Sequence, residues 1–208
     1  MSVTINASTS TGLVQSADTS GEIELQSNGT TALKVNTNEG IQILNCLGVG
    51  NATPSTSGAG ITFPATQSAS TDANTLDDYE EGTFTPTIRG SSTAGTGTYS
   101  TQNGTYIKIG RSVTVFGYIR WSAHTGTGAM QISNLPFTSF NGGDNYSVAP
   151  IFLQNIALTA SNYAQAVQVP NSTQIDLYQY PTGGGSTTTM PMDTSAEIGF
   201  SATYLATA

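Results

Sequence analysis

The chain has 208 residues, a formal net charge of −8 and only 9% charged side chains. The acidic balance opposes binding to nucleic acid, which needs basic patches, and attraction to anionic lipid. No apolar run approaches the roughly 18 residues of a membrane span, and the first residues lack the basic and apolar blocks of a signal peptide. We therefore expect a protein that is made in a cytoplasm and has neither nucleic acid nor membrane as a partner.

Threonine, with 34 residues, and glycine, with 23, dominate the composition. Threonine is β-branched and fits a pleated surface, which favours strands joined by turns. The hydrophobic share of 37% is low for a compact domain. Disordered chains carry few aromatics and many like charges, whereas this chain has few charges and spreads Tyr and Phe through its second half. The low apolar share instead predicts that part of the core is made between chains.

The first elements in chain order form a small β meander. Two alternating segments, Glu22–Gln26 and Thr31–Val35, flank Asn28–Gly29, which is the strongest short signal for a hairpin because both turn residues tolerate positive φ. A second turn at Asn38–Gly40 leads into Ile41–Leu44. Three short strands bury too little to be stable alone, so this module needs a partner.

A linker and one short helix are expected next. Residues 46–75 are rich in Gly, Ser and Thr, which predicts extended chain with little regular structure. A helical turn is predicted over Thr75–Glu81, because Thr75 can cap it, Asp77 and Asp78 fall in its first turn and Gly82 can close it.

Short strands fill the rest of the chain. Thr83–Ile88 is predicted to be an edge strand, because Pro86 cannot donate to a ladder. The longest strand is expected at Ser112–Trp121. Further strands are expected at Gly104–Ile109, Ala129–Ile132, Val148–Leu153, Thr173–Tyr178 and Glu197–Tyr204. The pattern predicts an all-β chain: an N-terminal β module over residues 1–45, a linker over 46–75, and an antiparallel, jelly-roll-like β-sandwich over 76–208.

Several segments resemble surface proteins of tailed bacteriophages. The segments that are similar to the N-terminal module of many phage tail-fibre and head-surface proteins are Thr4–Thr9, Gly12–Gln15, Ala17–Gly21 and Leu25–Thr31. Ala73–Thr87 looks like the segment that opens a β-sandwich tip domain in phage fibres. In that group a Gly-x-Tyr-x-Lys-x-Gly pattern follows, and it is matched here by Gly104, Tyr106, Lys108 and Gly110, while Leu135–Phe137 matches another recurring piece.

The resemblance implies a structural virion protein on the outer surface of the particle, assembled in the bacterial cytoplasm and homotrimeric. Tail fibres usually carry a long shaft, whereas here a linker of about 30 residues, at most ~100 Å when extended, joins the two parts. This favours a capsid decoration (cement) protein, whose N-terminal module binds the major capsid protein and whose sandwich faces outward. The alternative is the receptor-binding tip of a short tail fibre that recognises a host surface glycan.

The acidic residues of the chain allow two kinds of chemical site, a metal site and a glycosidase site, and each has a simpler interpretation. The acidic residues between Asp72 and Glu81 lack the spacing of a calcium-binding loop, which leaves a solvated helical turn as the preferred interpretation. A glycosidase needs two facing carboxylates, but the remaining acids are scattered. These acids are Asp144, Asp176, Asp193 and Glu197. We therefore expect no enzymatic activity, no cofactor and no metal.

The remaining candidate residues are a histidine, a cysteine and several aromatics. His124, the only histidine, is expected in an exposed loop, and the single Cys46 cannot form an intrachain disulfide. Aromatic side chains are enriched at interfaces, so four of them are candidates for surface contacts. These four are Tyr178, Tyr180, Tyr146 and Trp121, with a place in the core or in a trimer seam as the alternative for Trp121.

Overall fold

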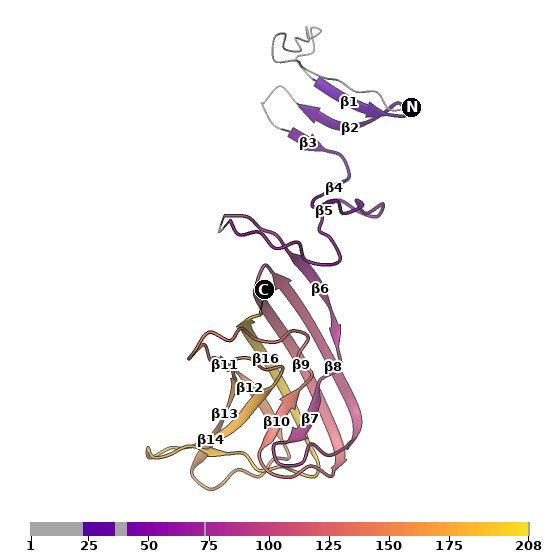
Figure 1. The fold of residues 1–208 in the computed structure, drawn as a ribbon. Helices are drawn as coiled ribbons and strands as arrows, with labels where there is room; N and C mark the ends of the chain where they lie inside the picture. Colours follow the sequence, from indigo (N-terminus) through magenta and orange to yellow (C-terminus); the bar gives the residue numbers. More distant parts are fainter. Residues whose placement is uncertain (1–22, 36–40, 73, 208) are drawn as a thin grey trace. The chain divides into compact units, whose positions relative to one another are not determined.

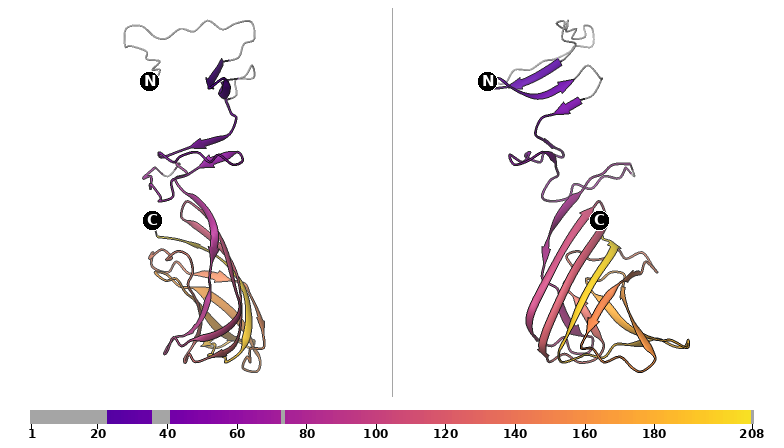
Figure 2. Two further views of the ribbon diagram at one scale, coloured as in Figure 1. Left: turned by 90° about the vertical axis from the view of Figure 1, so that its right-hand side faces the viewer. Right: turned by 180° about the vertical axis from the view of Figure 1, so that it is seen from behind.

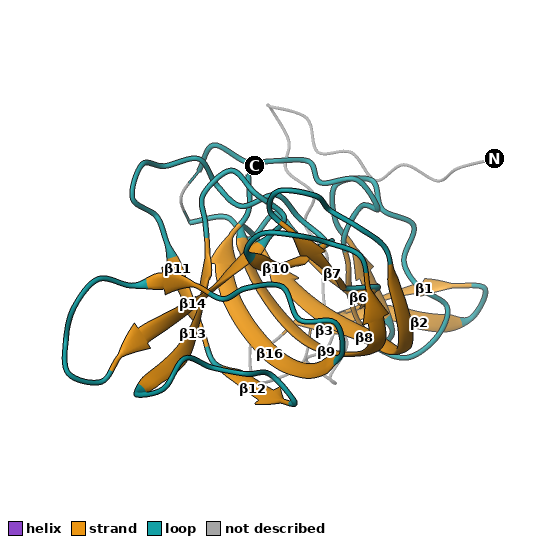
Figure 3. Cartoon of the chain, turned by 90° about the horizontal axis from the view of Figure 1, so that it is seen from below, coloured by secondary structure: helices purple, strands orange, loops and turns teal. Residues whose placement is uncertain are grey.

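The computed structural model describes residues 23–35, 41–72 and 74–207 (Figure 1). The chain divides into two units, Met1–Thr66 and Gln67–Ala208. The described residues form strands and loops only, as Figure 3 shows, so the all-β prediction is confirmed. No helix in the described ranges is long and apolar enough to cross a membrane.

The first unit contains the predicted meander. Strands β1 (Ile23–Ser27), β2 (Thr30–Val35) and β3 (Ile41–Ile43) pair antiparallel in the order β1-β2-β3. Asn28 and Gly29 join β1 to β2 with φ of 51° and 76°, the positive values that a tight hairpin turn requires. The predicted turn at Asn38–Gly40 and the N-terminal segments of the phage resemblance up to Gly21 lie outside the described residues.

This three-stranded sheet has one aliphatic and one polar face. The aliphatic face holds two cross-strand rows, one of Ile23, Val35 and Ile41 and the other of Leu25, Leu33 and Ile43. On the opposite face Glu24 lies beside Lys34, with 3.7 Å between Oε1 and Nζ, and Thr31 donates a hydrogen bond of 2.9 Å to the Glu24 carboxylate. The hydrogen bonds from Thr31 and Gln26 lower the pKa of Glu24.

Two very short strands follow in the stretch that was expected to be linker. Strands β4 (Cys46–Gly48) and β5 (Gly60–Thr62) pair in parallel, and the Cys46 thiol lies 3.6 Å from the carbonyl oxygen of Gly58. The boundary between the two units falls after Thr66, inside this stretch.

The second unit is a sandwich of two antiparallel sheets. The long sheet has the order β12-β16-β9-β8-β6, and its three longest strands are seen side by side in Figure 2. Its strands are β12 (Ile151–Gln154), β16 (Ala196–Leu205), β9 (Ser112–His124), β8 (Gly97–Ile109) and β6 (Tyr79–Phe84). The short sheet has the order β11-β13-β14-β10-β7, with β15 beside β14. Its strands are β11 (Ser147–Ala149), β13 (Asn162–Gln168), β14 (Ile175–Pro181), β10 (Met130–Ser133), β7 (Thr87–Gly90) and β15 (Thr188–Thr189).

Proline marks two of the corners where the chain passes between the sheets. Pro86 separates β6, an edge of the long sheet, from β7, an edge of the short sheet. Pro150 likewise separates β11 from β12, and its carbonyl accepts a hydrogen bond of 3.2 Å from the Ser201 amide. Proline lacks an N–H and therefore ends a ladder, while the bend carries the strand into the facing sheet. The predicted edge strand at Thr83–Ile88 is thus confirmed, but it is divided between the two sheets.

The core lies between the inner faces of the two sheets. Buried aliphatic side chains come from both, including Ile119 and Ile198 of the long sheet and Ile132, Ile175 and Leu177 of the short sheet. On the long sheet, Gly104 and Gly117 pair directly with each other, between Phe84 and Phe200. A Cβ atom on Gly117 would lie 2.3 Å from the Phe200 ring, so glycine here makes room for an aromatic side chain.

The predicted short helix over Thr75–Glu81 is wrong. Asp72 instead forms a turn in which its carboxylate accepts a hydrogen bond of 2.9 Å from the Asn74 amide. From Tyr79 onward the chain is strand β6, which pairs in register with Gly104–Ile109 of β8. Six cross-strand pairs outweigh the few capping signals of a helix shorter than three turns.

The burial of Tyr204 and the partial burial of Tyr99 predict that the sandwich loses stability at alkaline pH. Burial raises the pKa of Tyr99 and Tyr204 above the usual value near 10. As the pH rises, the unfolded chain therefore loses these protons before the folded chain does. The contribution of the two tyrosines to the free energy of unfolding is fully present below about pH 10 and is lost as the pH rises through their folded-state pKa. Burial lowers the pKa of Lys108, so this group, taken alone, destabilises the folded state less as the pH rises.

We expect the urea midpoint to be constant from pH 8 to 9 and to fall between pH 10 and 11. Tyr204→Phe should reduce this fall, because phenylalanine has no proton to lose. A midpoint that does not change up to pH 11 would contradict the assignment of these tyrosines to the core.

Candidate functional site

Three tyrosines, Tyr163, Tyr178 and Tyr180, project from the outer face of the short sheet, and we call them the tyrosine face. Strand alternation in β14 sends Ile175, Leu177 and Gln179 into the core, which leaves Tyr178 and Tyr180 on the outer side. In β13 the same alternation places Tyr163 outward, in register with Tyr180.

The tyrosine rings lie against one another. Tyr163 and Tyr180 are stacked with ring centroids 5.5 Å apart and an interplanar angle of 23°. Tyr178 meets Tyr180 edge-on, at 6.5 Å and 70°. Tyr163 is 51% exposed, so the cluster presents aromatic surface to solvent. Aromatic pairs in these geometries stabilise each other by about 0.5–1.5 kcal/mol beyond simple burial.

A fixed polar group lies beside the rings. Asp176 accepts a hydrogen bond of 2.7 Å from the Gln131 amide and one of 3.2 Å from the Tyr178 hydroxyl. Gln165 pairs in register with Tyr178, and Arg89 pairs with Gln131 on the neighbouring strand. The pKa of Tyr178 is raised, mainly by burial and further by the adjacent Asp176 carboxylate. The outer face thus combines aromatic rings with a carboxylate, two amides and a guanidinium.

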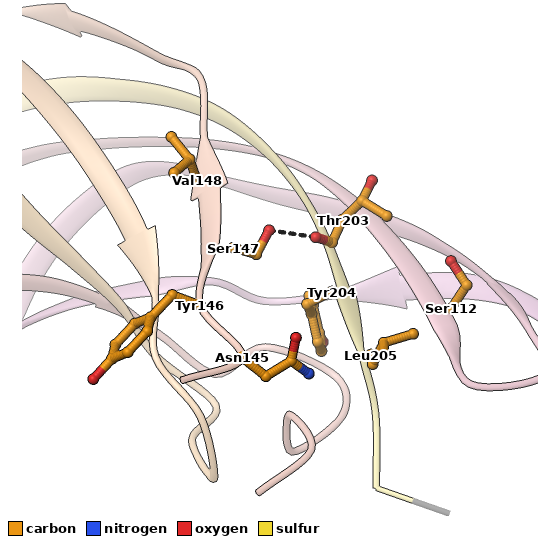
Figure 4. Close-up of a pocket in the computed structure, with 8 residues that line it drawn as sticks. All are labelled: Ser112, Asn145, Tyr146, Ser147, Val148, Thr203, Tyr204 and Leu205. Carbon is orange, nitrogen blue, oxygen red and sulfur yellow. Dashed lines mark hydrogen bonds between the residues drawn. The ribbon is translucent and has the colours of Figure 1, made fainter. Parts of the chain in front are cut away.

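Tyr146 precedes β11 and is 57% exposed. It borders a hollow of about 350 Å³ between β11 and the ends of β9 and β16, and Figure 4 shows its ring directed away from the other lining residues. In this hollow the Ser147 hydroxyl donates a hydrogen bond to the Thr203 carbonyl. The lining consists of Ser112, Asn145, Tyr146, Ser147, Val148, Thr203, Tyr204 and Leu205. The lining carries serine, threonine and tyrosine hydroxyls but no acid, histidine or cysteine.

Trp121, the fourth residue expected to make surface contacts, lies in the core instead. It is 2% exposed, because the inward face of β9 includes position 121. Its indole N–H donates a hydrogen bond of 3.1 Å to the Asp193 carbonyl, which satisfies the one polar atom that it buries. Trp121 therefore contributes to packing and not to the tyrosine face.

The acidic segment from Asp72 to Glu81 is distributed among structural contacts. Asp78 is buried and forms an ion pair with Lys108 of β8. Asp77 accepts a hydrogen bond of 2.7 Å from the Ser70 amide, and Glu81 accepts one of 3.1 Å from the Tyr79 hydroxyl. In the described ranges, no three Asp, Glu, His or Cys side chains converge in a way that could hold a metal ion.

His124 does not occupy an exposed loop, as the sequence suggested, but ends β9 and is 8% exposed. Its Nδ1 accepts a hydrogen bond of 2.9 Å from the Gly126 amide, and its Nε2 lies 3.0 Å from the Ile88 carbonyl. The carbonyl requires a donor, so Nε2 carries the proton. Both ring nitrogens thus have structural partners.

Sequence reasoning missed Tyr163, although a signal for it exists. Asn162–Gln168 alternates between larger outward side chains and the inward Ala164 and Ala166, as expected for a half-buried strand. Alanine is a weak strand former, which obscures the pattern.

No protein-family model matches the sequence, and no curated protein matches it. Among solved structures, the crystal structure of the Dettilon tailspike protein is similar to 61% of this chain, with a TM-score of 0.46 and 21% sequence identity. The matched part is 24% of that tailspike chain, so this chain spans about a quarter of its length.

Proposed function

We propose that the chain is a non-enzymatic structural protein on the outer surface of a tailed-bacteriophage particle, acting as a homotrimeric capsid decoration protein. The sequence resemblance of Leu25–Thr31, Ala73–Thr87 and Gly104–Gly110 to phage surface proteins supports this role. The observation that carries it is the aliphatic face of the small first unit. Ile23, Leu25 and Ile41 on this face are 47%, 52% and 70% exposed in the described part of the chain.

A sheet with an exposed aliphatic face of this kind is stable only when another apolar surface packs against that face. Strands β1 to β3 contribute 5, 6 and 3 residues, too few to form a stable sheet without a further apolar surface. The six side chains of this face that the structure describes are uncharged, so copies of a chain with net charge −8 can meet there without bringing these positions into repulsion. A trimer assembled in this way would present three attachment units to the major capsid protein. Three linked binding events raise the overall affinity even when each single contact stays the same.

Ile41→Asp is expected to dissociate the trimer, because it would bury a charge in the apolar contact. Gln42→Asp is the matched control. Gln42 is next to Ile41 on β3 but lies on the polar face, where it pairs with Lys34 of β2. Sedimentation velocity of the full chain should show a trimer for the unmodified protein and for Gln42→Asp, and a monomer for Ile41→Asp. A stable monomer of the unmodified chain at micromolar concentration would contradict the proposal.

The positions of two of the four scattered acids, Asp176 and Glu197, support a non-enzymatic role. Asp176 is held by Gln131 and Tyr178 on the outer face of the short sheet. Glu197 lies on the long sheet, where it accepts a hydrogen bond from Tyr118 and pairs with Arg120 at 3.0 Å. Glycoside hydrolysis uses two carboxylates that flank one bond, and these two acids occupy different sheets.

The second candidate function is a receptor-binding tip of a short tail fibre, and the tyrosine face favours it. Imaging of labelled protein on particles separates the two functions, because decoration covers the head and a fibre marks the tail. Binding of the purified chain to host cells would support the tip, while binding to undecorated heads alone would support decoration.

A further inference from the structure

We propose that Lys108 and Asp78 join their side chains in an intramolecular amide bond, which forms spontaneously after folding. Until the reaction occurs, freshly folded chains hold the two groups as a buried ion pair. This bond belongs to the sandwich itself and does not depend on where the chain sits on a particle.

Three functional groups meet on the inner side of the long sheet, where β6 pairs with β8. Lys108 lies directly opposite Glu80 in the register, and Asp78 stands two positions before Glu80, so strand alternation directs all three side chains to the same side. The Lys108 ammonium donates a hydrogen bond to the Asp78 carboxylate and lies 3.9 Å from Oε1 of Glu80. The site thus combines an amine, a carboxyl group that the amine can attack and a second carboxylate that can carry protons.

Both reacting groups are removed from water. Lys108 is 4% exposed and Asp78 is 3% exposed, and the centre of the Phe137 ring lies 5.3 Å from the Lys108 nitrogen. Burial lowers the pKa of Lys108, which favours the neutral amine with its free electron pair. The exclusion of water also opposes the reverse reaction, which is hydrolysis of the amide.

The reaction is a condensation without oxidation or reduction. A proton passes from the ammonium to the Asp78 carboxylate, which leaves a neutral amine beside a neutral carboxylic acid. The nitrogen electron pair then attacks the carboxyl carbon of Asp78, and the carbonyl oxygen becomes negatively charged in a tetrahedral intermediate. Glu80 takes one proton from the nitrogen and returns it to the departing hydroxyl, so that one water molecule leaves and the carbonyl re-forms. One positive and one negative charge disappear together, which leaves the net charge of the chain unchanged.

Fixed contact and burial favour the amide over the ion pair. Contact within one folded chain replaces an encounter between two molecules, and effective molarities of such arrangements reach about 10⁵–10⁸ M. The desolvation of a buried ion pair offsets much of its Coulombic attraction, and a neutral amide avoids this penalty. The pair of Arg120 with Glu197 in the same sheet cannot react in this way, because a guanidinium stays protonated.

The bond would fix the strand through which the chain enters the sandwich. Within the described residues, β6 is the first strand of the second unit, and it forms an edge of the long sheet. The amide closes a loop of 30 positions, which restricts the unfolded chain as a disulfide does. A pull that arrives along the chain from the first unit reaches Asp78 before β6, so β6 cannot peel away from β8 while the bond is intact.

Mass spectrometry of the denatured full chain tests the bond directly. The expected mass is lower than the mass calculated from the sequence by one water molecule. Trypsin cuts after arginine and lysine but not after an acylated lysine, so digestion should release residues 35–89 linked to residues 90–111. Fragmentation of this linked peptide should place the bond between Asp78 and Lys108.

Two variants separate the bond from the ion pair. Glu80→Gln keeps Asp78 and Lys108 but removes the proton carrier, so the bond should form at least about a hundredfold more slowly. Glu81→Gln is the matched control, because Glu81 lies on the outer side of the same strand, where it accepts a hydrogen bond from Tyr79. This control should lose water at the rate of the unmodified chain. Circular dichroism confirms that both variants fold.

Two results would overturn the inference. An unmodified chain that keeps its full calculated mass after prolonged incubation in the folded state would show that the ion pair does not react. Equal rates of water loss in Glu80→Gln and Glu81→Gln would remove Glu80 from the reaction.

Discussion

Replacing Lys108 by alanine is expected to lower the free energy of unfolding of the sandwich by about 3–5 kcal/mol. Lys108 is 4% exposed and forms an ion pair with Asp78, which is 3% exposed. The Lys108 ammonium also lies 3.5 Å from the Gln67 side-chain oxygen, 3.9 Å from Glu80 and 5.3 Å from the centre of the Phe137 ring. Alanine would leave the Asp78 carboxylate buried without its cation, and this accounts for most of the expected loss.

Two further variants make this prediction specific. Arg120→Ala removes a guanidinium that is 58% exposed from Glu197, whose buried carboxylate keeps its hydrogen bond from Tyr118. Because only one partner of this ion pair is buried, we expect a smaller loss than for Lys108→Ala, about 1–2 kcal/mol. The double variant Asp78→Leu with Lys108→Met should recover most of the stability, since a buried ion pair can be replaced by apolar side chains of similar volume. Urea unfolding followed by circular dichroism measures all three. Equal losses for Lys108→Ala and Arg120→Ala would show that the Asp78 pair is solvated.

Trp121→Ala is expected to cost about 3–5 kcal/mol, the loss typical of truncating a buried large aromatic. Trp121 lies on β9 between Tyr99 of β8 and Ala196 of β16, and its side chain belongs to the core, so its removal opens a cavity between the two sheets. Trp121→Phe keeps much of the ring volume but gives up the hydrogen bond to the Asp193 carbonyl, and should cost about 1–2 kcal/mol.

The unmodified chain carries one tryptophan, so its fluorescence provides an independent check. We expect a blue-shifted emission in the folded protein that moves to longer wavelength on unfolding. An emission maximum typical of water-exposed indole, or a loss below about 1 kcal/mol for Trp121→Ala, would place this side chain on the surface.

Local patterns predicted the elements whose signals are short-range. Asn28–Gly29 identified the first hairpin because its positive φ values depend only on those two residues. Pro86 identified an edge strand because a missing N–H limits pairing wherever the strand lies. The long strand β9 was expected from its alternation up to Trp121, and the strand continues to His124, where two exposed residues in succession break the alternation.

The predictions that were wrong depended on partners distant in sequence. Asp78 was interpreted as part of a helical first turn, but its partner Lys108 lies 30 positions away on β8. His124 was predicted to lie in a loop, but its Nε2 forms a hydrogen bond with the carbonyl oxygen of Ile88, which is 36 positions away. The tyrosine face likewise forms only when β13 and β14 pair, which brings Tyr163 against Tyr180. The sequence pattern within one strand does not indicate which residues of a distant strand will pair with it.

The number of copies of the chain in purified particles tests the virion-surface role most directly. A calibrated protein gel of purified particles from a phage that encodes this chain would give this number against the major capsid protein. Decoration predicts on the order of hundreds of copies per particle, in proportion to the symmetric shell, whereas about six trimers would indicate a tail-fibre tip. Absence of the chain from purified particles would contradict a virion-surface role.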